Sequence, residues 1–180
     1  MTYKTHIALA MLPSIPLAAM AYEQEPINIL FFLAASVIGS LAPDLDEEGS
    51  YLSNKLPVFP MLFKLFGVKH RGITHRLIFV IWMMTAFLVF CAYENSFQKY
   101  SPFLYGFLLG YFMHLVGDML TKGGINKFFY PFFDAKGVLL PRKFRFYTGS
   151  INETFVLLFI ALGLGIESYY IFGAQIGKLF

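Results

Sequence analysis

Five apolar stretches run through this chain, and they constrain its fold more than any other feature. Each is about 16 to 20 residues long, roughly what a helix needs to cross a bilayer once flanking residues are added. With 57% hydrophobic and only 14% charged residues, the composition is too apolar for an ordinary soluble domain. The sequence predicts an all-α, polytopic membrane bundle of about five membrane-embedded helices, forming one domain over residues 1–180. The stretches are Ile7–Tyr22, Ile27–Ala42, Leu77–Tyr93, Pro102–Leu120 and Phe155–Ala174.

The first stretch has two interpretations. Pro13 and Pro16 interrupt it, so this segment must be kinked or only partly inserted in the membrane. Lys4 before the apolar run and Ala19-Met20-Ala21 near its end also resemble a signal peptide with its cleavage site, although the prolines count against that interpretation.

Two long polar connections, Pro43–Arg76 and Thr121–Thr154, separate the stretches, and two short ones complete the chain. Within the first, Leu56–Val68 is apolar but interrupted by proline, lysine and glycine, which favours a segment lying in the membrane interface. Within the second, Phe128–Phe133 is typical of an aromatic interfacial anchor.

The distribution of basic residues predicts the orientation. If the N-terminus is cytoplasmic, that face carries twelve basic residues and the opposite face carries only Lys99 and Lys178. The positive-inside rule therefore favours a cytoplasmic N-terminus and two cytoplasmic long connections. The twelve are Lys4, Lys55, Lys64, Lys69, Arg71, Arg76, Lys122, Lys127, Lys136, Arg142, Lys143 and Arg145.

Other features exclude some classes of protein. The net charge is only +3 and the basic residues are divided among separate loops rather than forming one basic stripe, so the sequence does not indicate nucleic-acid binding. Cys91 is the only cysteine, so it cannot form an intramolecular disulfide and is expected to pack as a small apolar residue.

Five alternating crossings would bring seven scattered histidine and aspartate residues to one membrane face. His114 and Asp118 end the fourth stretch at a spacing of four, so both project from one side of a helix and can share a metal ion. Ionisable groups at a bilayer are costly unless they are paired, solvated or functional. The predicted metal ligands are His6, Asp44, Asp46, His70, His75, His114 and Asp118.

Each motif also has a structural explanation. The His114–Asp118 pair could line a gap between helices, and Asp44 and Asp46 could belong to an acidic loop. His70 and His75 could be part of a basic interfacial anchor. His6 alone would be an ordinary surface histidine, and it gains significance only from sharing the face.

Four residues are predicted to act in catalysis. Arg71 lies between two histidines beside a threonine, where it could bind an anionic group. Arg145 could clamp a phosphate and Glu153 could act as a base, although each could equally be a helix-start charge. The predicted catalytic residues are Asp46, Arg71, Arg145 and Glu153.

Imidazole and carboxylate ligands suit hard or borderline divalent ions, so zinc is expected and manganese is an alternative. Seven ligands exceed one site and would suffice for two or three ions about 3.5 to 4 Å apart, as in sites for phosphoryl displacement.

The motifs together resemble a known family. An early Thr5-His6, PDLD at 43–46, HRGITH at 70–75, HLVGDMLTKGG at 114–124 and a Pro131-Phe132 pair are similar to the YdjM-like family of bacterial inner-membrane metal-dependent hydrolases. Some members of that family are LexA-regulated, and the family is distantly similar to helical zinc-dependent phospholipase C, which also uses an HxxxD helix pair.

The resemblance implies a ligand set of His6, Asp44 or Asp46, His70, His75, His114 and Asp118. Two residues depart from the family pattern: Arg76 stands where a serine is frequent, and Met113 replaces a small polar residue. Neither departure removes a ligand.

We therefore expect an enzyme of the bacterial inner membrane that hydrolyses phosphoesters, with phospholipids or other membrane-bound lipids as substrates. Its multinuclear metal site would lie at the cytoplasmic face, where Arg71 or Arg145 would neutralise the leaving phosphate. The alternative is a non-enzymatic metal transporter or metal sensor, and a purely structural adaptor would leave the histidine clusters unexplained.

Overall fold

The computed structural model describes residues 1–65, 67, 71–94 and 97–176, with side chains described for residues 1–65, 67, 71–93 and 99–173. Regular structure in these residues is helical apart from two isolated bridges, which confirms the all-α prediction. The long helices are α1 (Tyr3–Ala21), α2 (Pro26–Leu41), α5 (Leu77–Glu94), α6 (Phe97–Leu120) and α7 (Ile151–Ile176). The shorter elements are η1 (Ala42–Asp46), α3 (Tyr51–Lys55), α4 (Val58–Leu65) and η2 (Ile73–His75).

Within the described residues, three helical segments are long and apolar enough to cross a membrane: Pro26–Asp46, Lys99–Leu120 and Ile151–Gly173. The apolar helix over Leu77–Tyr93 is shorter. α1 is one continuous helix despite its two prolines, and it packs against α2, α6 and α7. These lengths and compositions support an integral membrane bundle.

α1, α6 and α7 begin four or five residues earlier than the apolar residues suggest, because their first turns are polar, whereas α5 begins at Leu77 as expected. α7 starts at Ile151 rather than Phe155, after Ser150, whose backbone carbonyl accepts from Thr154 N at 3.2 Å. The Ser150 side chain also accepts from the backbone amide of Glu153 at 3.4 Å. A serine that receives the first free amides is a typical helix start.

α2 and α6 form the most extensive contact in the bundle, and small residues make it possible. A Cβ added to Gly110 would overlap the backbone of Ser36, and one added to Gly106 would overlap the backbone of Phe32. Helices in membranes approach this closely where the interface lacks side chains. α1 lies across this pair, and Ser14 of α1 hydrogen-bonds Ser36 of α2 at 2.7 Å.

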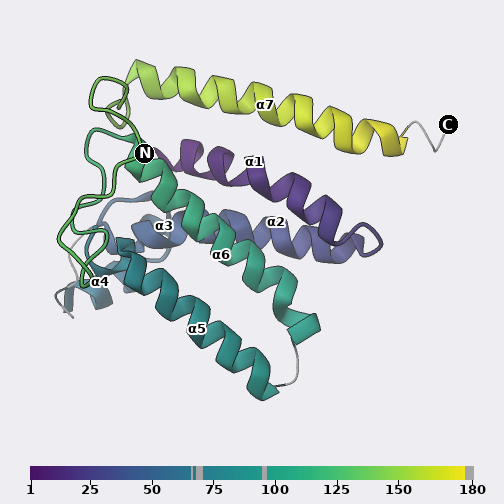
Figure 1. Cartoon of the computed structure of the whole chain (residues 1–180), viewed down its shortest axis with the longest axis horizontal. Helices are drawn as coiled ribbons and strands as arrows, with labels where there is room; N and C mark the ends of the chain where they lie inside the picture. The colour runs from purple at the N-terminus through teal and green to yellow at the C-terminus, as the bar shows by residue number, and fades with distance from the viewer. Residues whose placement is uncertain (66, 68–70, 95–96, 177–180) are drawn as a thin grey trace.

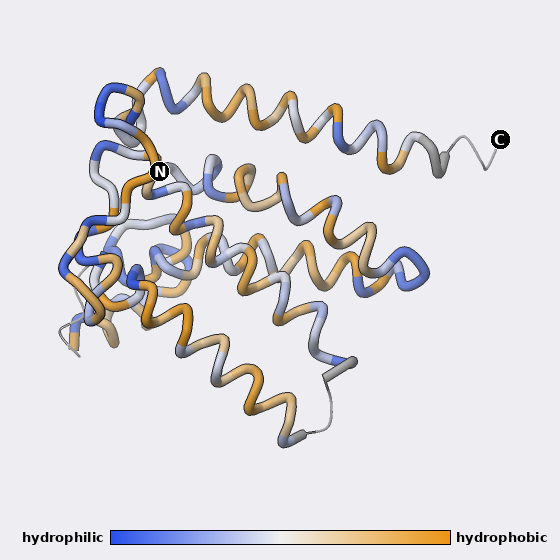
Figure 2. The backbone as a smooth tube through the Cα atoms, in the orientation of Figure 1, coloured by the Kyte–Doolittle hydropathy of each residue, from blue (hydrophilic) through white to orange (hydrophobic). Residues whose placement is uncertain are grey.

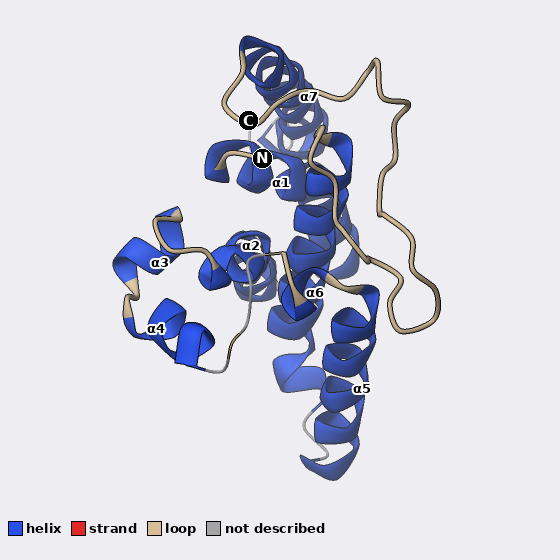
Figure 3. Ribbon diagram, turned by 90° about the vertical axis from the view of Figure 1, so that its left-hand side faces the viewer, coloured by secondary structure: helices blue, strands red, loops and turns tan. Residues whose placement is uncertain are grey.

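The polar segments of the chain lie mainly at one end of the bundle. The starts of α1, α5 and α7 and the ends of α2 and α6 lie at this end, together with both long connections (Figure 1). Colouring by hydropathy shows the hydrophilic segments concentrated there and in the short turn between α1 and α2 (Figure 2). Viewed onto this end, α3 and α4 lie on one side and the connection from α6 to α7 on the other (Figure 3).

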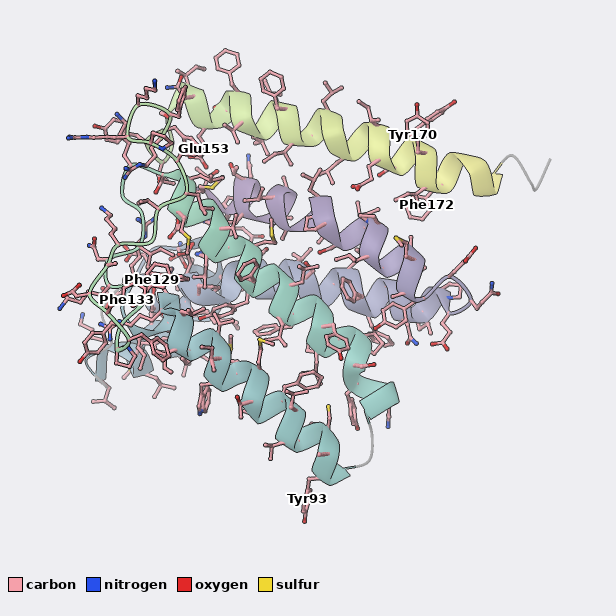
Figure 4. The ribbon with its side chains drawn as sticks, viewed as in Figure 1. Tyr93, Phe129, Phe133, Glu153, Tyr170 and Phe172 are labelled. Carbon is pink, nitrogen blue, oxygen red and sulfur yellow. The ribbon has the colours of Figure 1, made fainter. Side chains whose placement is uncertain are left out.

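The connection from α6 to α7 is held firmly against the helices. Ile125 and Phe128 are buried in a core cluster with Leu115 and Met119 of α6. Phe128 O accepts from Leu77 N at 2.9 Å, which ties the connection to the start of α5. Phe129 and Phe133 lie at the same end of the molecule (Figure 4). The predicted aromatic anchor is thus divided, because Phe128 is buried whereas Phe133 is exposed.

The segment after α3 has the exposed apolar surface expected of an interfacial helix. In α4, Val58, Met61 and Leu65 are 61%, 74% and 77% exposed. Of the predicted interfacial segment Leu56–Val68, residues 66 and 68 lie outside the described residues.

The close packing of α2 on α6 gives a stability prediction. Gly110→Ala should lower the free energy of unfolding by about 1–3 kcal/mol, because its methyl group would meet the Ser36 backbone. Thermal unfolding of the purified protein in detergent measures this. Gly165→Ala is the matched control, since a Cβ there has open space. Equal stability of the two variants would contradict the proposed close packing.

Candidate metal centre

His114 and Asp118 lie on the last two turns of α6 and are both buried. The backbone carbonyl of Ser40, at the end of α2, lies 2.7 Å from His114 Nδ1. This contact fixes the ring and directs Nε2 toward Asp44, whose Oδ1 is 3.5 Å away. A carbonyl at one ring nitrogen of histidine typically orients the other nitrogen for a metal.

His75 enters the same space from η2, at the start of α5. Its Nε2 atom lies 3.9 Å from Asp44 Oδ1 and 3.8 Å from Asp118 Oδ2. Its other nitrogen, Nδ1, lies 3.5 Å from Asp46 Oδ2. Thr74 donates a hydrogen bond to the same Asp46 oxygen. Asp46 therefore lies on the Nδ1 side of the imidazole ring, whereas Asp44 lies on the Nε2 side, which faces the rest of the cluster.

His6 completes the cluster from the first turns of α1. Its ring stacks on the ring of His114, with centroids 3.7 Å apart and planes within 8° of parallel. Its Nε2 atom lies 3.6 Å from Asp118 Oδ1. Two groups of side chains have ligand atoms within 4.8 Å of one another: His6, His114 and Asp118, and Asp44, His75 and His114.

The donor atoms fit divalent metal ions. Within the described residues, His114 Nε2 and Asp118 Oδ2 are buried without a hydrogen-bond partner, as are both ring nitrogens of His6. Buried polar atoms are nearly always hydrogen-bonded, so such a concentration of exceptions requires an explanation. Mixed imidazole and carboxylate donors match the preferences of zinc and manganese.

Positive groups surround Asp118. Arg71 Nη2 and the Met1 amino group each lie 2.8 Å from Asp118 Oδ1. Arg71 Nη1 also donates to Gly124 O at 3.1 Å. A Cβ on Gly123 would lie 2.6 Å from Arg71 Nη1, so a side chain at that position would displace the guanidinium.

Arg145 lies beside the cluster rather than in it. Its Nε donates to Leu140 O at 2.8 Å. It lines a cavity of about 640 Å³ whose wall also includes Arg71. Arg71 therefore contacts the histidine and aspartate cluster on one side and this cavity on the other.

Glu153 fixes the chain instead of facing the cluster. Its Oε1 accepts from Thr2 N at 2.6 Å, and its Oε2 accepts from Gly149 N at 2.6 Å. Figure 4 shows Glu153 at the start of α7, at the site end of the molecule. The bond to Thr2, the residue just before α1, joins the start of α1 to α7 and thereby helps to place His6.

The structure brings six of the seven predicted ligands to one end of the bundle: His6, Asp44, Asp46, His75, His114 and Asp118. The seventh, His70, lies outside the described residues. Sequence reasoning missed the orienting carbonyl of Ser40. No sequence signal could reveal it, because every residue presents a carbonyl and only packing selects one.

Comparison with known proteins supports a membrane location. The chain is 30% identical over 92 residues to the inner membrane protein YdjM of Escherichia coli (strain K12) and, equally, to that of Shigella flexneri. Each alignment covers 51% of this chain and 45% of the relative, so the chain spans about half the length of the curated relatives it matches. No solved structure matches. The model of the YdjM inner membrane protein family matches residues 1–178, and the chain therefore belongs to that family of inner membrane proteins.

Proposed function

We propose that this protein is a membrane-embedded, metal-dependent hydrolase of phosphoesters, with phospholipids or other membrane-bound lipids as substrates. The observation that carries the proposal is the convergence of buried imidazole and carboxylate groups from α1, α2–η1, η2 and α6 beside a cavity lined by arginines. Buried ionisable residues in a membrane protein mark functional sites more often than structural ones.

Two overlapping ligand groups would hold two or three ions. His6, His114 and Asp118 form one group, and Asp44, His75 and His114 form the other. The Asp118 carboxylate directs Oδ1 toward His6 and Oδ2 toward His75. Divalent ions in such sites supply Lewis acidity and a water nucleophile near neutral pH.

The neighbouring residues have separate tasks. Asp46 accepts from Thr74 and faces Nδ1 of His75, so it orients that ring. Arg71 extends toward the basic cavity and would neutralise the negative charge of the phosphate as the ester P–O bond breaks. Arg145 would bind an anionic group of the substrate headgroup in the same cavity, and Glu153 would act through the placement of α1.

We place the site at the cytoplasmic face of the inner membrane. Twelve of the 14 basic residues belong to the N-terminal segment and the two long connections. The described parts of these segments lie at the site end of the bundle (Figure 1). Such a bias in short loops is typical of the cytoplasmic side. A site at this level would meet lipid headgroups without extracting the lipid.

The first prediction of this function concerns the metal content of the purified protein. The purified parent protein should contain zinc or manganese, and His114→Ala and Asp118→Ala should each lose most of it, since both residues belong to the ligand groups. Elemental analysis by mass spectrometry measures this. Asp134→Ala removes an exposed carboxylate paired with Lys127 and serves as the control. If both site variants kept the full metal content, the ligand assignment would be wrong.

A second prediction separates the two aspartates of PDLD. Asp46→Asn should fold and retain metal but bind it about 10- to 100-fold more weakly, because an orienting carboxylate is weakened rather than a ligand removed. Asp44→Asn should have the larger effect, since Asp44 faces both His75 and His114. Competition with a chelating dye gives both affinities, and the reverse order would refute the assigned roles.

The third prediction concerns activity. The parent should release phosphate or a phosphorylated headgroup from phosphoester substrates in mixed micelles, and His75→Ala should reduce this at least about 100-fold by disrupting the ligand group. The assay should add zinc and manganese separately. Metal binding without cleavage of any phosphoester would instead support the metal transporter or sensor.

A further inference from the structure

The cavity beside the metal centre has an unusually positive wall. Five of its lining residues are basic, namely Arg71, Lys122, Lys136, Arg142 and Arg145, and none of the described residues that line it is an aspartate or glutamate. Only Arg71 reaches the ligand cluster, where it pairs with Asp118. In the described part of the chain, no ion pair joins the other four to a carboxylate.

These cations are held where they are by the connection from α6 to α7. Lys122 N donates to Phe146 O at 2.8 Å, and Ile125 and Gly137 exchange backbone hydrogen bonds of 3.0 and 2.8 Å. The Lys122 ammonium lies 5.1 Å from the centre of the Tyr147 ring, within the range of a cation–π contact. Concentrating like charges on a folded segment is unfavourable unless an anion neutralises them.

The size and charge of the cavity exceed what one phosphate requires. About 640 Å³ lies in the range of sites for complete small molecules. In the proposed reaction, Arg71 is the cation nearest the ligand groups, so one phosphate at the metal centre would engage it and leave the other four basic residues unused. A zwitterionic headgroup would bring its ammonium group into a positive wall, which is repulsive.

Exposed aromatic residues near the cavity favour a position at the level of the lipid headgroups. Phe144 and Tyr147 are 62% and 67% exposed and flank Arg145 in the sequence. The connection joins Leu120 to Ile151, which end and begin two of the candidate membrane spans. Aromatic side chains at this level are typical of membrane interfaces.

We propose that the basic cavity binds a second phosphate of the substrate, so that the substrate class is a membrane lipid with two phosphate groups in its headgroup. This inference rests on the proposed function and specifies its substrate. Arg71 links the two subsites: one phosphate lies at the metal centre, and the second lies among Lys136, Arg142 and Arg145.

The test measures binding of non-hydrolysable ligands to the full-length protein, as purified in detergent, by calorimetry. Methylenediphosphonate alkylated with farnesyl at its bridging carbon has no ester bond and should bind about tenfold more tightly than farnesyl phosphonate, since the second anionic group gains charge-assisted hydrogen bonds. Lys136→Gln combined with Arg142→Gln should abolish this preference and change monophosphonate binding by less than about threefold.

The matched control is Lys127→Gln combined with Lys143→Gln. It removes two positive charges from the same connection, but neither residue lines the cavity. This variant should keep the preference for the diphosphonate. Equal loss in both double variants would reduce the effect to net charge and overturn the proposed subsite, and so would equal binding of the two ligands by the parent.

Methylenediphosphonate without a lipid tail distinguishes a lipid from a soluble substrate. It should bind at least about tenfold more weakly than the farnesyl compound, and equal binding would overturn the lipid assignment. Hydrolysis of farnesyl diphosphate and of the phosphoester substrates of the activity assay is followed separately. A retained binding preference without hydrolysis of any of them would refute the proposed function and leave the subsite standing, whereas hydrolysis without the preference would do the reverse.

Discussion

The close approach of α2 and α6 is the constraint on which the rest of the site depends. With no side chain at Gly106 and Gly110, the two backbones meet, and the end of α2 comes to lie beside the last turns of α6. The Ser40 carbonyl can then bind His114 Nδ1. Because η1 continues directly from α2, the same approach brings Asp44 to His114 Nε2. A packing contact between helices thus sets the geometry of the polar groups at their end.

Burial of the cluster is costly, and the surrounding charges reduce that cost. A carboxylate as buried as Asp118 requires compensation, and Arg71 and the Met1 amino group provide it at one oxygen. The other oxygen faces His75. In the proposed function, ions bound by the histidines would complete this compensation. The bundle then holds its imidazoles in place before any ligand arrives, which is what catalysis by positioned groups requires.

Sequence periodicity predicted much of this arrangement and failed where packing decides. The spacing of His114 and Asp118 was sufficient to place both on one side of a helix, and alternating apolar stretches predicted that His6 would share their end. The same reasoning made both aspartates of PDLD metal ligands and Asp46 also catalytic, whereas the 3₁₀ turn of η1 places Asp44 near Nε2 of His75 and Asp46 near its Nδ1. The sequence allowed Glu153 to be either a catalytic base or a helix-start charge. Its bonds to Thr2 could not be predicted, because they depend on how α1 packs against α7.

The two long connections line the site with opposite charges, acidic residues in one cavity and basic residues in another. A cavity of about 290 Å³ is lined by Asp44, Glu47 and Glu48, whereas the larger cavity is lined by the basic residues. Arg71 and Thr148 line both. Cations are attracted to the acidic side and anions to the basic side. In the proposed function, metal ions would approach the cluster through the acidic cavity and phosphates through the basic one, with Arg71 lining both.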